Sequence, residues 1–515
     1  MTILPSRHGT VDVPAISITE KLFEGMAGRG AEPAIIDGPS GAALSAGDLI
    51  ERIKRLAGGL TERGVLPGGT VAMLAPNMPD YPVVFHGVAW GGGTVTTINP
   101  TYTAPEIHHQ LIDSGAVMLV TVPAFAKAAR AATEGTGVRD IVIIGAETGL
   151  SLDDVMGQPL ERQVPVELDE HVVVLPYSSG TTGRPKGVML THRNLVANVT
   201  QAGAVAGITP EDTAIAFLPF FHIYGMTVLM NLFLQQRARL VTMPRFELEP
   251  FLRLIEEHRA TRLYVVPPVA LALAKHPLVD SYDVSSVEEI FSGAAPLGPE
   301  TEVAVGARFG ARSVQGYGMT EMAPISHMTV SGAVRHGSSG QAVPSTECRI
   351  VDAETLQDAA PGEEGELWVR GPQVMKGYLD NEQATAESLT PDGWLRTGDL
   401  AVIDADGFMF IRDRLKELIK FKGFQVAPAE VEAALCAHDG IADAAVIGKP
   451  DAEAGEVPVA FVVRAPGSDV GEAELQAHVE GCLAHYKHPG EFRFVDSVPK
   501  SASGKILRRQ LRDTV

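Results

Sequence analysis

The run from Pro176 to Gly187 contains the groups that are needed to bind a polyphosphate. It reads Pro-Tyr-Ser-Ser-Gly-Thr-Thr-Gly-Arg-Pro-Lys-Gly. Its glycines let the backbone approach a ligand and turn N–H groups inward, its hydroxyls add hydrogen bonds, and Lys186 adds a cation. It is not the G-x-x-x-x-G-K-[ST] loop because, counted from Gly180, Pro185 stands where the second glycine belongs. A flexible connection of the same composition is the alternative interpretation.

Two further segments combine glycine with an acidic side chain. The segment Gln315 to Glu321 reads Gln-Gly-Tyr-Gly-Met-Thr-Glu. It fails the dinucleotide-binding spacing G-x-G-x-x-G because Glu321 takes the third glycine's place. In the segment Trp394 to Leu400, Asp399 can accept hydrogen bonds from two sugar hydroxyls, although a solvated turn aspartate has the same local sequence. Neither segment specifies a reaction by itself.

One histidine and one lysine stand out by their neighbours. His222 lies in the apolar, aromatic run Phe217 to Gly225, where a hydrogen-bonded core histidine is the alternative to a site residue. Lys505 lies in the tail string Pro-Lys-Ser-Ala-Ser-Gly-Lys-Ile, which in isolation resembles a basic, solvated terminus. The sequence contains neither a G-x-S-x-G nucleophile elbow nor an H-E-x-x-H zinc helix.

Composition excludes several classes of function. The net charge of −21 argues against a nucleic-acid binder, which needs basic patches, but not against a local ATP pocket. The 3 cysteines are scattered without a C-x-x-C pair, which favours a reducing, cytoplasmic location and predicts neither a disulfide framework nor a zinc site. The start of the chain lacks the pattern of a signal peptide.

The uncharged stretch from Ala214 to Leu234 is long enough to span a bilayer. It also contains Pro219, Gly225 and Asn231, so we expect a buried strand, turn and helix that line a pocket. Membrane contact is therefore expected to be at most peripheral.

Strands alternate with helices along the first half of the chain. Ser45 and Asp48 predict the start of an amphipathic helix over 44–64. Further helices are expected over 79–91 and 104–114, and Thr191 can cap another. Strands are expected over 71–74, 93–98, 117–122 and 172–175, then over 262–266, where two prolines predict a turn, and over 290–292. The alternation predicts parallel βαβ units.

The chain changes character near residues 411–417, a charged segment that predicts a boundary. A helix over 428–437, strands over 442–447 and 457–464, and a helix over 472–486 follow. At 515 residues, at least two domains are expected. We predict an α/β protein with a large N-terminal domain of layered βαβ subdomains (1–413), a hinge (414–416), and a small mobile α+β C-terminal domain (417–515).

These motifs, taken in order, resemble those of the adenylate-forming superfamily, which includes acyl-CoA synthetases, peptide-synthetase adenylation domains and luciferases. The resemblance covers residue 30 to the end. The runs Phe221–Tyr224, Ser292–Gly298 and Lys420–Gly423 are most similar to the coumarate–CoA ligase and fatty acyl-CoA synthetase branch.

The resemblance implies a role for each matched residue. It assigns catalysis to Lys505, His222, Thr320 and Glu321, with Glu321 and Thr181 at Mg²⁺. It assigns ATP or AMP binding to Ser178, Ser179, Gly180, Thr181, Thr182, Gly183, Lys186, Gly293, Ala294, Ala295, Gln315, Gly316, Tyr317, Gly318, Met319, Thr320, Asp399, Ile411, Arg414 and Lys505. It assigns acyl binding to His222, Ile223, Tyr224, Gly225, Val228, Gly293, Gly316, Gly318 and Pro324, CoA binding to Lys420, Phe421, Lys422 and Gly423, and the hinge to Asp413 and Lys416.

The implied reaction is the ATP-dependent ligation of a carboxylic acid to coenzyme A through an acyl-adenylate, with Mg²⁺ as the metal. Apolar Met226 and Val228 beside His222 favour an aliphatic or unsubstituted aryl acid. An acyl carrier protein is the alternative acceptor, which the lysine pair at 420 and 422 disfavours. A luciferase-like oxygenase and a non-catalytic nucleotide-binding relative are further alternatives. The protein is expected to be a monomer or homodimer.

Overall fold

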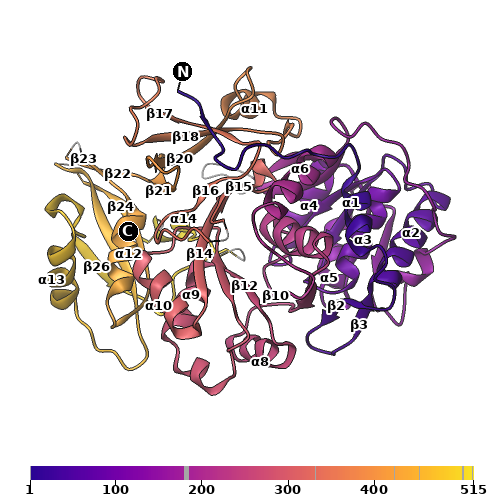
Figure 1. Ribbon diagram of the computed structural model, residues 1–515, viewed down its shortest axis with the longest axis horizontal. Helices are drawn as coiled ribbons and strands as arrows, with labels where there is room; N and C mark the ends of the chain where they lie inside the picture. The colour runs from indigo at the N-terminus through magenta and orange to yellow at the C-terminus, as the bar shows by residue number, and fades with distance from the viewer. Residues whose placement is uncertain are drawn as a thin grey trace.

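The computed structural model describes residues 2–178, 185–330, 332–422, 424–451, 453–501, 504–512 and 514–515. Within these residues the strands form four sheets, three in the first 414 residues and one in the C-terminal region. Figure 1 shows the C-terminal sheet and its helices as a separate lobe at one end of the molecule. The α/β fold class is confirmed.

The first sheet contains the strand that precedes the glycine- and hydroxyl-rich run. Its order is β19 (Gly377–Tyr378), β9 (Lys186–Thr191), β8 (Val172–Ser178), β5 (Thr94–Thr97), β4 (Thr70–Leu74), β6 (Ala116–Thr121) and β7 (Asp140–Ile143). Five adjacent strands, which run from β8 to the edge strand β7, are parallel, as predicted, and are separated by helices along the chain. Strand β9 returns antiparallel to β8, so Lys186 lies opposite Ser178. The run thus connects two paired strands.

The second sheet is also parallel at its centre. Its order is β16 (Gln341–Ala342), β15 (Ile325–Met328), β14 (Arg312–Gly318), β13 (Glu289–Ser292), β12 (Arg262–Val265), β10 (Thr213–Ala216), β11 (Arg239–Thr242), β2 (Pro33–Asp37) and β3 (Ala43–Ser45). Strands β13 and β14 run parallel and in register, so the ends of the segments that carry Gly293 and Gly316 lie at the same edge of the sheet.

The third and fourth sheets lie on either side of the predicted hinge. The third is antiparallel and contains β1 (Leu4–Pro5), β17 (Glu347–Val351), β18 (Gly365–Arg370), β20 (Leu395–Ile403) and β21 (Met409–Arg414). The fourth contains β23 (Phe424–Val426), β22 (Ile419–Phe421), β25 (Gly455–Arg464), β24 (Ile441–Asp451) and β26 (Glu491–Phe494). Apolar residues of the last region form their own clusters, apart from the main core. The domain limits stay a prediction.

The predicted helices form close to their expected limits. They are α2 (Ala46–Glu62), α3 (Asp80–Trp90), α4 (Ala104–Asp113), α6 (His192–Gly203), α12 (Pro428–Ala437) and α13 (Glu472–Cys482). Ser45 and Thr191 accept the N–H groups of Asp48 and Asn194 as N-caps. The others are α1 (Ile18–Met26), α5 (Ala126–Thr133), α7 (Leu232–Gln235), α8 (Leu248–His258), α9 (Pro267–Lys275), α10 (Pro299–Phe309), α11 (Glu382–Ser388) and α14 (Arg508–Arg512).

Three boundary predictions were wrong. Residues 43–45 form strand β3, so α2 begins later than residue 44. Helix α13 ends at Cys482 and not at 486. Pro267 and Pro268 do not form a turn but begin α9, because the first helical positions need no bonded N–H and proline already has a helical φ.

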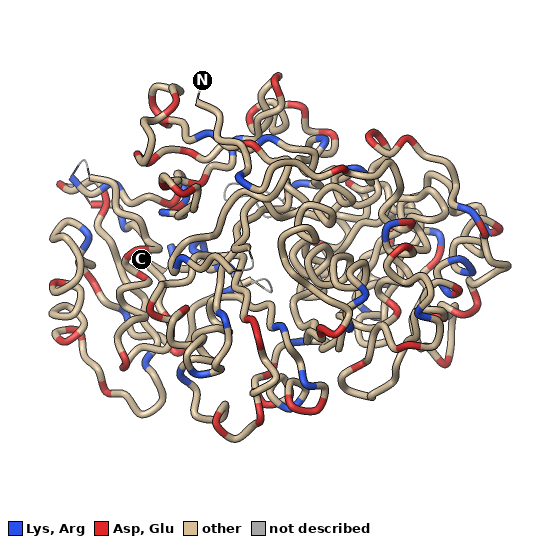
Figure 2. Tube along the Cα trace, viewed as in Figure 1, with Lys and Arg blue, Asp and Glu red and all other residues tan. Residues whose placement is uncertain are grey.

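The uncharged stretch 214–234 is buried, as expected. It contains the end of β10, a π-helical segment Tyr224–Asn231, and the first residues of α7. Among the residues that the structure describes, no helix is both long and apolar enough to cross a bilayer. Figure 2 shows acidic and basic residues interspersed along the Cα trace.

Three buried histidines make the N-terminal region sensitive to acid. Burial lowers the pKa values of His86, His192 and His327 from 6.5 to about 3. Between pH 6.5 and 3 the unfolded chain therefore binds protons that the folded chain does not, so the free energy of unfolding falls as pH falls. Each histidine contributes about 1.4 kcal/mol per pH unit in that window.

His327→Gln is therefore expected to reduce this pH dependence by about one proton. The measurement is urea unfolding at pH 7.5 and 5.0, followed by tryptophan fluorescence, since all 3 tryptophans lie before residue 413. An unchanged slope of unfolding free energy against pH would contradict the assignment.

Candidate active site

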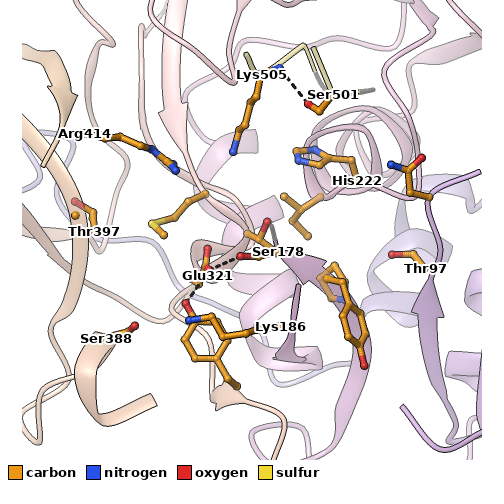
Figure 3. A pocket seen from close by; sticks show the side chains of 18 of the residues that line it. Thr97, Ser178, Lys186, His222, Glu321, Ser388, Thr397, Arg414, Ser501 and Lys505 are labelled. Carbon is orange, nitrogen blue, oxygen red and sulfur yellow. Dashed lines mark hydrogen bonds between the residues drawn. The ribbon is translucent and has the colours of Figure 1, made fainter. Parts of the chain in front are cut away.

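A cavity of about 430 Å³ opens where the first and third sheets meet the C-terminal tail. Its wall includes Ser178 at the end of β8, Lys186 at the start of β9, and the segment Met319–Glu321 that follows β14. Thr397 and Gly398 of β20, Arg414 of β21 and Lys505 of the tail complete it. Figure 3 shows these side chains converging from distant parts of the chain. Four separate sequence motifs thus meet in one cavity.

Glu321 lies at the floor of the cavity and is held by two hydroxyl groups. Its Oε1 accepts hydrogen bonds from Ser178 Oγ at 3.0 Å and from the hydroxyl of Tyr378 at 2.9 Å. Burial, aided by the Glu321 carboxylate, raises the pKa of Tyr378, so its hydroxyl stays protonated and donates. The ammonium of Lys186 lies 4.2 Å from the centre of the Tyr378 ring. The carboxylate and the lysine are therefore organised by the same tyrosine.

Asp399, next to Gly398 of the cavity wall, is bound on both carboxylate oxygens. Tyr317 donates its hydroxyl to Oδ2 at 2.6 Å, and Arg414 Nε lies 3.1 Å from Oδ1. Burial, followed by the negative charge of Asp399, raises the pKa of Tyr317 well above its usual value, so this hydroxyl remains a donor. A carboxylate offers about four acceptor positions, so Asp399 retains capacity for sugar hydroxyls.

Lys505 reaches the cavity from the C-terminal tail. Its side chain points toward Glu321 and Arg414 in Figure 3, and its backbone N–H donates to Ser501 Oγ at 3.1 Å. Burial lowers the pKa of Lys505, Arg414 lowers it further, and the carboxylates of Glu321 and Asp399 oppose that shift. We call this arrangement, with Lys505 in the cavity, the closed orientation of the C-terminal region.

His222 faces the cavity beside Lys505. Burial lowers its pKa to about 3, and the charge of Lys505 adds to the effect. The imidazole is therefore neutral at physiological pH and is a weak proton acceptor. Ile223 lines the same wall.

The other residues predicted to bind the acyl group do not line this cavity. Tyr224 and Val228 are buried in the π-helical segment, and the Tyr224 ring lies against Gly293, where an added Cβ would approach it to 3.1 Å. A Cβ added at Gly316 would lie 2.3 Å from the Phe291 ring. One added at Gly318 would lie 2.2 Å from the Pro324 carbonyl oxygen. At Gly225 it would lie 2.3 Å from the Pro219 carbonyl oxygen.

Of the remaining residues predicted to bind ATP or AMP, some line the cavity and others do not. Gln315 is buried, and its side chain bonds Leu297 and Glu302. Ala294, Ala295 and Ile411 are partly exposed, and Met319 and Thr320 line the cavity. The predicted phosphate ligands Ser179, Gly180, Thr181, Thr182 and Gly183, the metal ligand Thr181 among them, lie outside the described residues.

Three residues predicted to bind CoA, Lys420, Phe421 and Lys422, lie on the β22–β23 hairpin and do not line the cavity. Lys420 and Lys422 are exposed, Phe421 is half-buried, and Gly423 is outside the described residues. Of the two hinge residues, Lys416 lines the cavity. Asp413 is buried, and its carboxylate accepts the N–H groups of Arg414 and Ala429.

Several cavity residues were missed because no sequence motif contains them. Glu366 accepts the Gly398 N–H at 2.9 Å and the Trp368 indole at 2.8 Å, and so supports the turn before Asp399. Tyr378 contacts Glu321 across 57 positions of sequence. No motif contains Thr97, Asn99, Tyr102, Gln110, Glu387 or Ser388 either, whereas Arg396 and Ser501 lie inside motifs but were given no role. Strand alternation places Glu366 and Trp368 on one face, but nothing in the sequence shows which strand lies beside them.

Two family models match the chain. The model described as AMP-binding enzyme matches residues 22–379, and the AMP-binding enzyme C-terminal domain matches residues 430–505. 4-Coumarate–CoA ligase 2 of Nicotiana tabacum is 42% identical over 95% of this chain and 93% of its own. 4-Coumarate–CoA ligase 5 of Oryza sativa subsp. japonica is 40% identical over 99% of this chain and 97% of its own.

A solved structure extends the similarity to three dimensions. An anthranilate–CoA ligase in complex with anthranoyl-AMP superposes with a TM-score of 0.92, at 26% identity and over 98% of both chains. The chain therefore belongs to the AMP-binding enzymes of the adenylate-forming superfamily and, within it, to the acid–CoA ligases of the 4-coumarate–CoA ligase type.

Proposed function

We propose that this enzyme adenylates an apolar carboxylic acid with MgATP and then transfers the acyl group to CoA in a second orientation of its C-terminal domain. In the first step the substrate carboxylate attacks the α-phosphorus of ATP, and pyrophosphate leaves. In the second step the CoA thiol attacks the acyl carbonyl, loses its proton, and AMP leaves. The attacking carboxylate is already an anion, so the first step needs positioning and charge neutralisation and no general base.

The observation that carries this proposal is the meeting of Lys505, Glu321 and Arg414 around one cavity. Lys505 comes from the C-terminal tail, whereas the other two come from the N-terminal region. Its ammonium would bridge the substrate carboxylate and the α-phosphate and so stabilise the negative charge of the transition state. Lys186 and Ser178 would bind the outer phosphates.

The donor set at Glu321 fits a magnesium ion. Two hydroxyls occupy only part of the acceptor capacity of the Glu321 carboxylate. A carboxylate next to phosphate oxygens is the environment that Mg²⁺ prefers, and Glu321, with Thr181 of the preceding loop, would hold it. Such an ion neutralises charge on the leaving pyrophosphate.

The thiol-transfer step requires a different arrangement because Lys505 fills the position next to the acyl carbon. A rotation at the hinge, Asp413 to Lys416, would withdraw Lys505 and bring the β22–β23 hairpin to the cavity. Exposed Lys420 and Lys422 on that hairpin suit the phosphates of CoA. Neutral His222, at the edge of the cavity, would act as a gate between the acyl pocket and the thiol and not as a base.

The acyl wall behind His222 is apolar. Ile223 lines the cavity beside His222, and Met226 and Val228 are buried in the π-helical segment that follows it. A hydroxylated ring would lose hydrogen bonds to water on binding against such an apolar segment. The proposed substrate is therefore an aliphatic or unsubstituted aryl acid, in contrast to the acid in the names of the plant relatives.

An acid panel tests both the reaction and the substrate. Straight-chain, branched, cinnamic and 4-coumaric acids are each incubated with ATP and Mg²⁺, with and without CoA, and pyrophosphate and product mass are measured together. Pyrophosphate plus acyl-CoA, with cinnamic acid or an aliphatic acid preferred to 4-coumaric acid, is the expected result. Preference for 4-coumaric acid would contradict the proposed acid class.

The same panel addresses the acceptor. Acyl-adenylate that forms without acyl-CoA, and is consumed only when a holo acyl carrier protein is added, would contradict CoA as acceptor. No turnover with any acid would contradict the proposed reaction.

A further inference from the structure

Lys275, at the end of a helix in the N-terminal region, forms hydrogen bonds to the C-terminal region. It is the last residue of α9, in the N-terminal region. Its ammonium donates to three backbone carbonyls of the C-terminal region, those of Cys436 at 3.0 Å, His438 at 3.2 Å and Ile441 at 3.3 Å. All three lie at or just beyond the C-terminal end of α12, where the helix dipole favours a cation.

The opposite end of α12 is held by a charge of the opposite sign. Asp413, at the end of β21, accepts the N–H of Ala429 at 2.9 Å, in the first turn of α12. A carboxylate at the N-terminal end and an ammonium at the C-terminal end both complement the helix dipole. Two side chains, Asp413 at the hinge and Lys275 from the N-terminal region, thus fix the position of α12 in the closed orientation.

These two contacts must behave differently when the C-terminal domain rotates. Asp413 lies at the hinge itself, so its distance from the first turn of α12 changes little during rotation. Lys275 binds the far end of a helix of 10 residues, about 15 Å from that point. A rotation that withdraws Lys505 therefore separates Lys275 from its carbonyl partners.

Helix α9 also links Lys275 to the tail loop that carries Lys505. Val266 precedes α9, and the tail passes so close to it that a Cβ added at Gly504 would lie 2.9 Å from Val266 Cγ2. The N-terminal end of α9 thus contacts the residue before Lys505, and its C-terminal end binds α12. Lys275 stabilises the same orientation that this close contact requires.

We propose that Lys275 is a positioning residue for adenylation, which acts by holding the C-terminal domain in the closed orientation. The inference rests on the domain rotation of the proposed function. Charge-assisted bonds to Lys275 are present in the adenylating orientation and absent after rotation, so their loss shifts the equilibrium between the two orientations. Because Lys275 is exposed, we expect a shift of about tenfold, not hundredfold.

The test separates the two half-reactions. Lys275→Met removes the charge and keeps the length of the side chain, and Lys275→Arg restores a cation. Lys127→Met, an exposed lysine on α5, is the matched control. Adenylation is measured by acid-dependent exchange of pyrophosphate into ATP, and thiol transfer by single-turnover reaction of purified acyl-adenylate with CoA.

Adenylation is expected to fall about tenfold in Lys275→Met, to recover in Lys275→Arg and to be unchanged in Lys127→Met. Thiol transfer is expected to be unchanged or faster in all three. Equal losses in both half-reactions, or unchanged exchange in Lys275→Met, would overturn the proposal. Tryptophan-detected melting of Lys275→Met should match the wild type, and a variant that melts early and loses both half-reactions also counts against it.

The outcome is distinguishable from failure of the proposed function. A wild-type enzyme that exchanges pyrophosphate but forms no thioester would contradict the proposed acceptor. The ratio of exchange rates between Lys275→Met and wild type would still decide whether Lys275 supports adenylation.

Discussion

Lys505→Ala is expected to lower the rate of acyl-adenylate formation by a factor of about 10²–10³, the loss that follows removal of one well-placed donor to a developing negative charge. The side chain of Lys505 points toward both Glu321 and Arg414 in Figure 3. Transfer from preformed acyl-adenylate to CoA should remain close to wild type, because the second step needs Lys505 withdrawn. The two half-reactions, measured separately, check this expectation.

Lys500→Met is the matched control for this variant. Lys500 lies in the same tail, but its ammonium pairs with Asp443 of β24 and not with the cavity. Adenylation should therefore stay near wild type in Lys500→Met. Equal losses in the Lys500 and Lys505 variants, or a parallel loss of thiol transfer in Lys505→Ala, would contradict the assigned role.

Glu321→Gln is expected to raise the Mg²⁺ concentration needed for half-maximal adenylation by at least tenfold and to lower the maximal rate by about 10². Glutamine keeps the size of the side chain, and its carbonyl oxygen can still accept the hydroxyls of Ser178 and Tyr378. Only the negative charge at the metal position is removed. Titrations of pyrophosphate release with Mg²⁺ measure both effects.

The same variant has a second consequence at Lys505. The Glu321 carboxylate raises the pKa of Lys505, against the lowering by burial and by Arg414. Removing that charge should lower the lysine pKa further, so the alkaline limb of the adenylation rate should move to lower pH. Glu347→Gln, a surface partner of Arg370, is the control and should shift neither the Mg²⁺ titration nor the pH profile. An Mg²⁺ dependence that stays at the wild-type value would exclude Glu321 as a ligand.

Local sequence was sufficient to predict the structure wherever a side chain interacts within its own segment. Ser45 and Thr191 cap helices through N–H groups three residues ahead, so the caps could be predicted from spacing alone. Helix α12 forms over the expected residues for the same local reasons. The prolines at 267 and 268 were misjudged because the same pair is compatible with a turn and with the start of a helix.

The motifs by themselves also determined the family, since four segments in a fixed order are far more specific than any one of them. They did not determine the partners of each side chain. Glu321 depends on Tyr378, Asp399 on Tyr317 and on Arg414, and α12 on Lys275, and each pair is separated in sequence by more than ten residues. Such contacts arise only when sheets and lobes pack together.

The acyl site shows the same limit most clearly. The sequence places Tyr224 and Gly293 in separate segments, and only the tertiary structure packs the ring of Tyr224 against Gly293. Likewise, the sequence identifies Lys505 but not its position, because only the packing of the C-terminal region against the rest of the protein brings the tail to the cavity. The chemistry of this protein was therefore determined by residue types and their order, whereas only tertiary packing decided which residues meet, because burial and charge act through space.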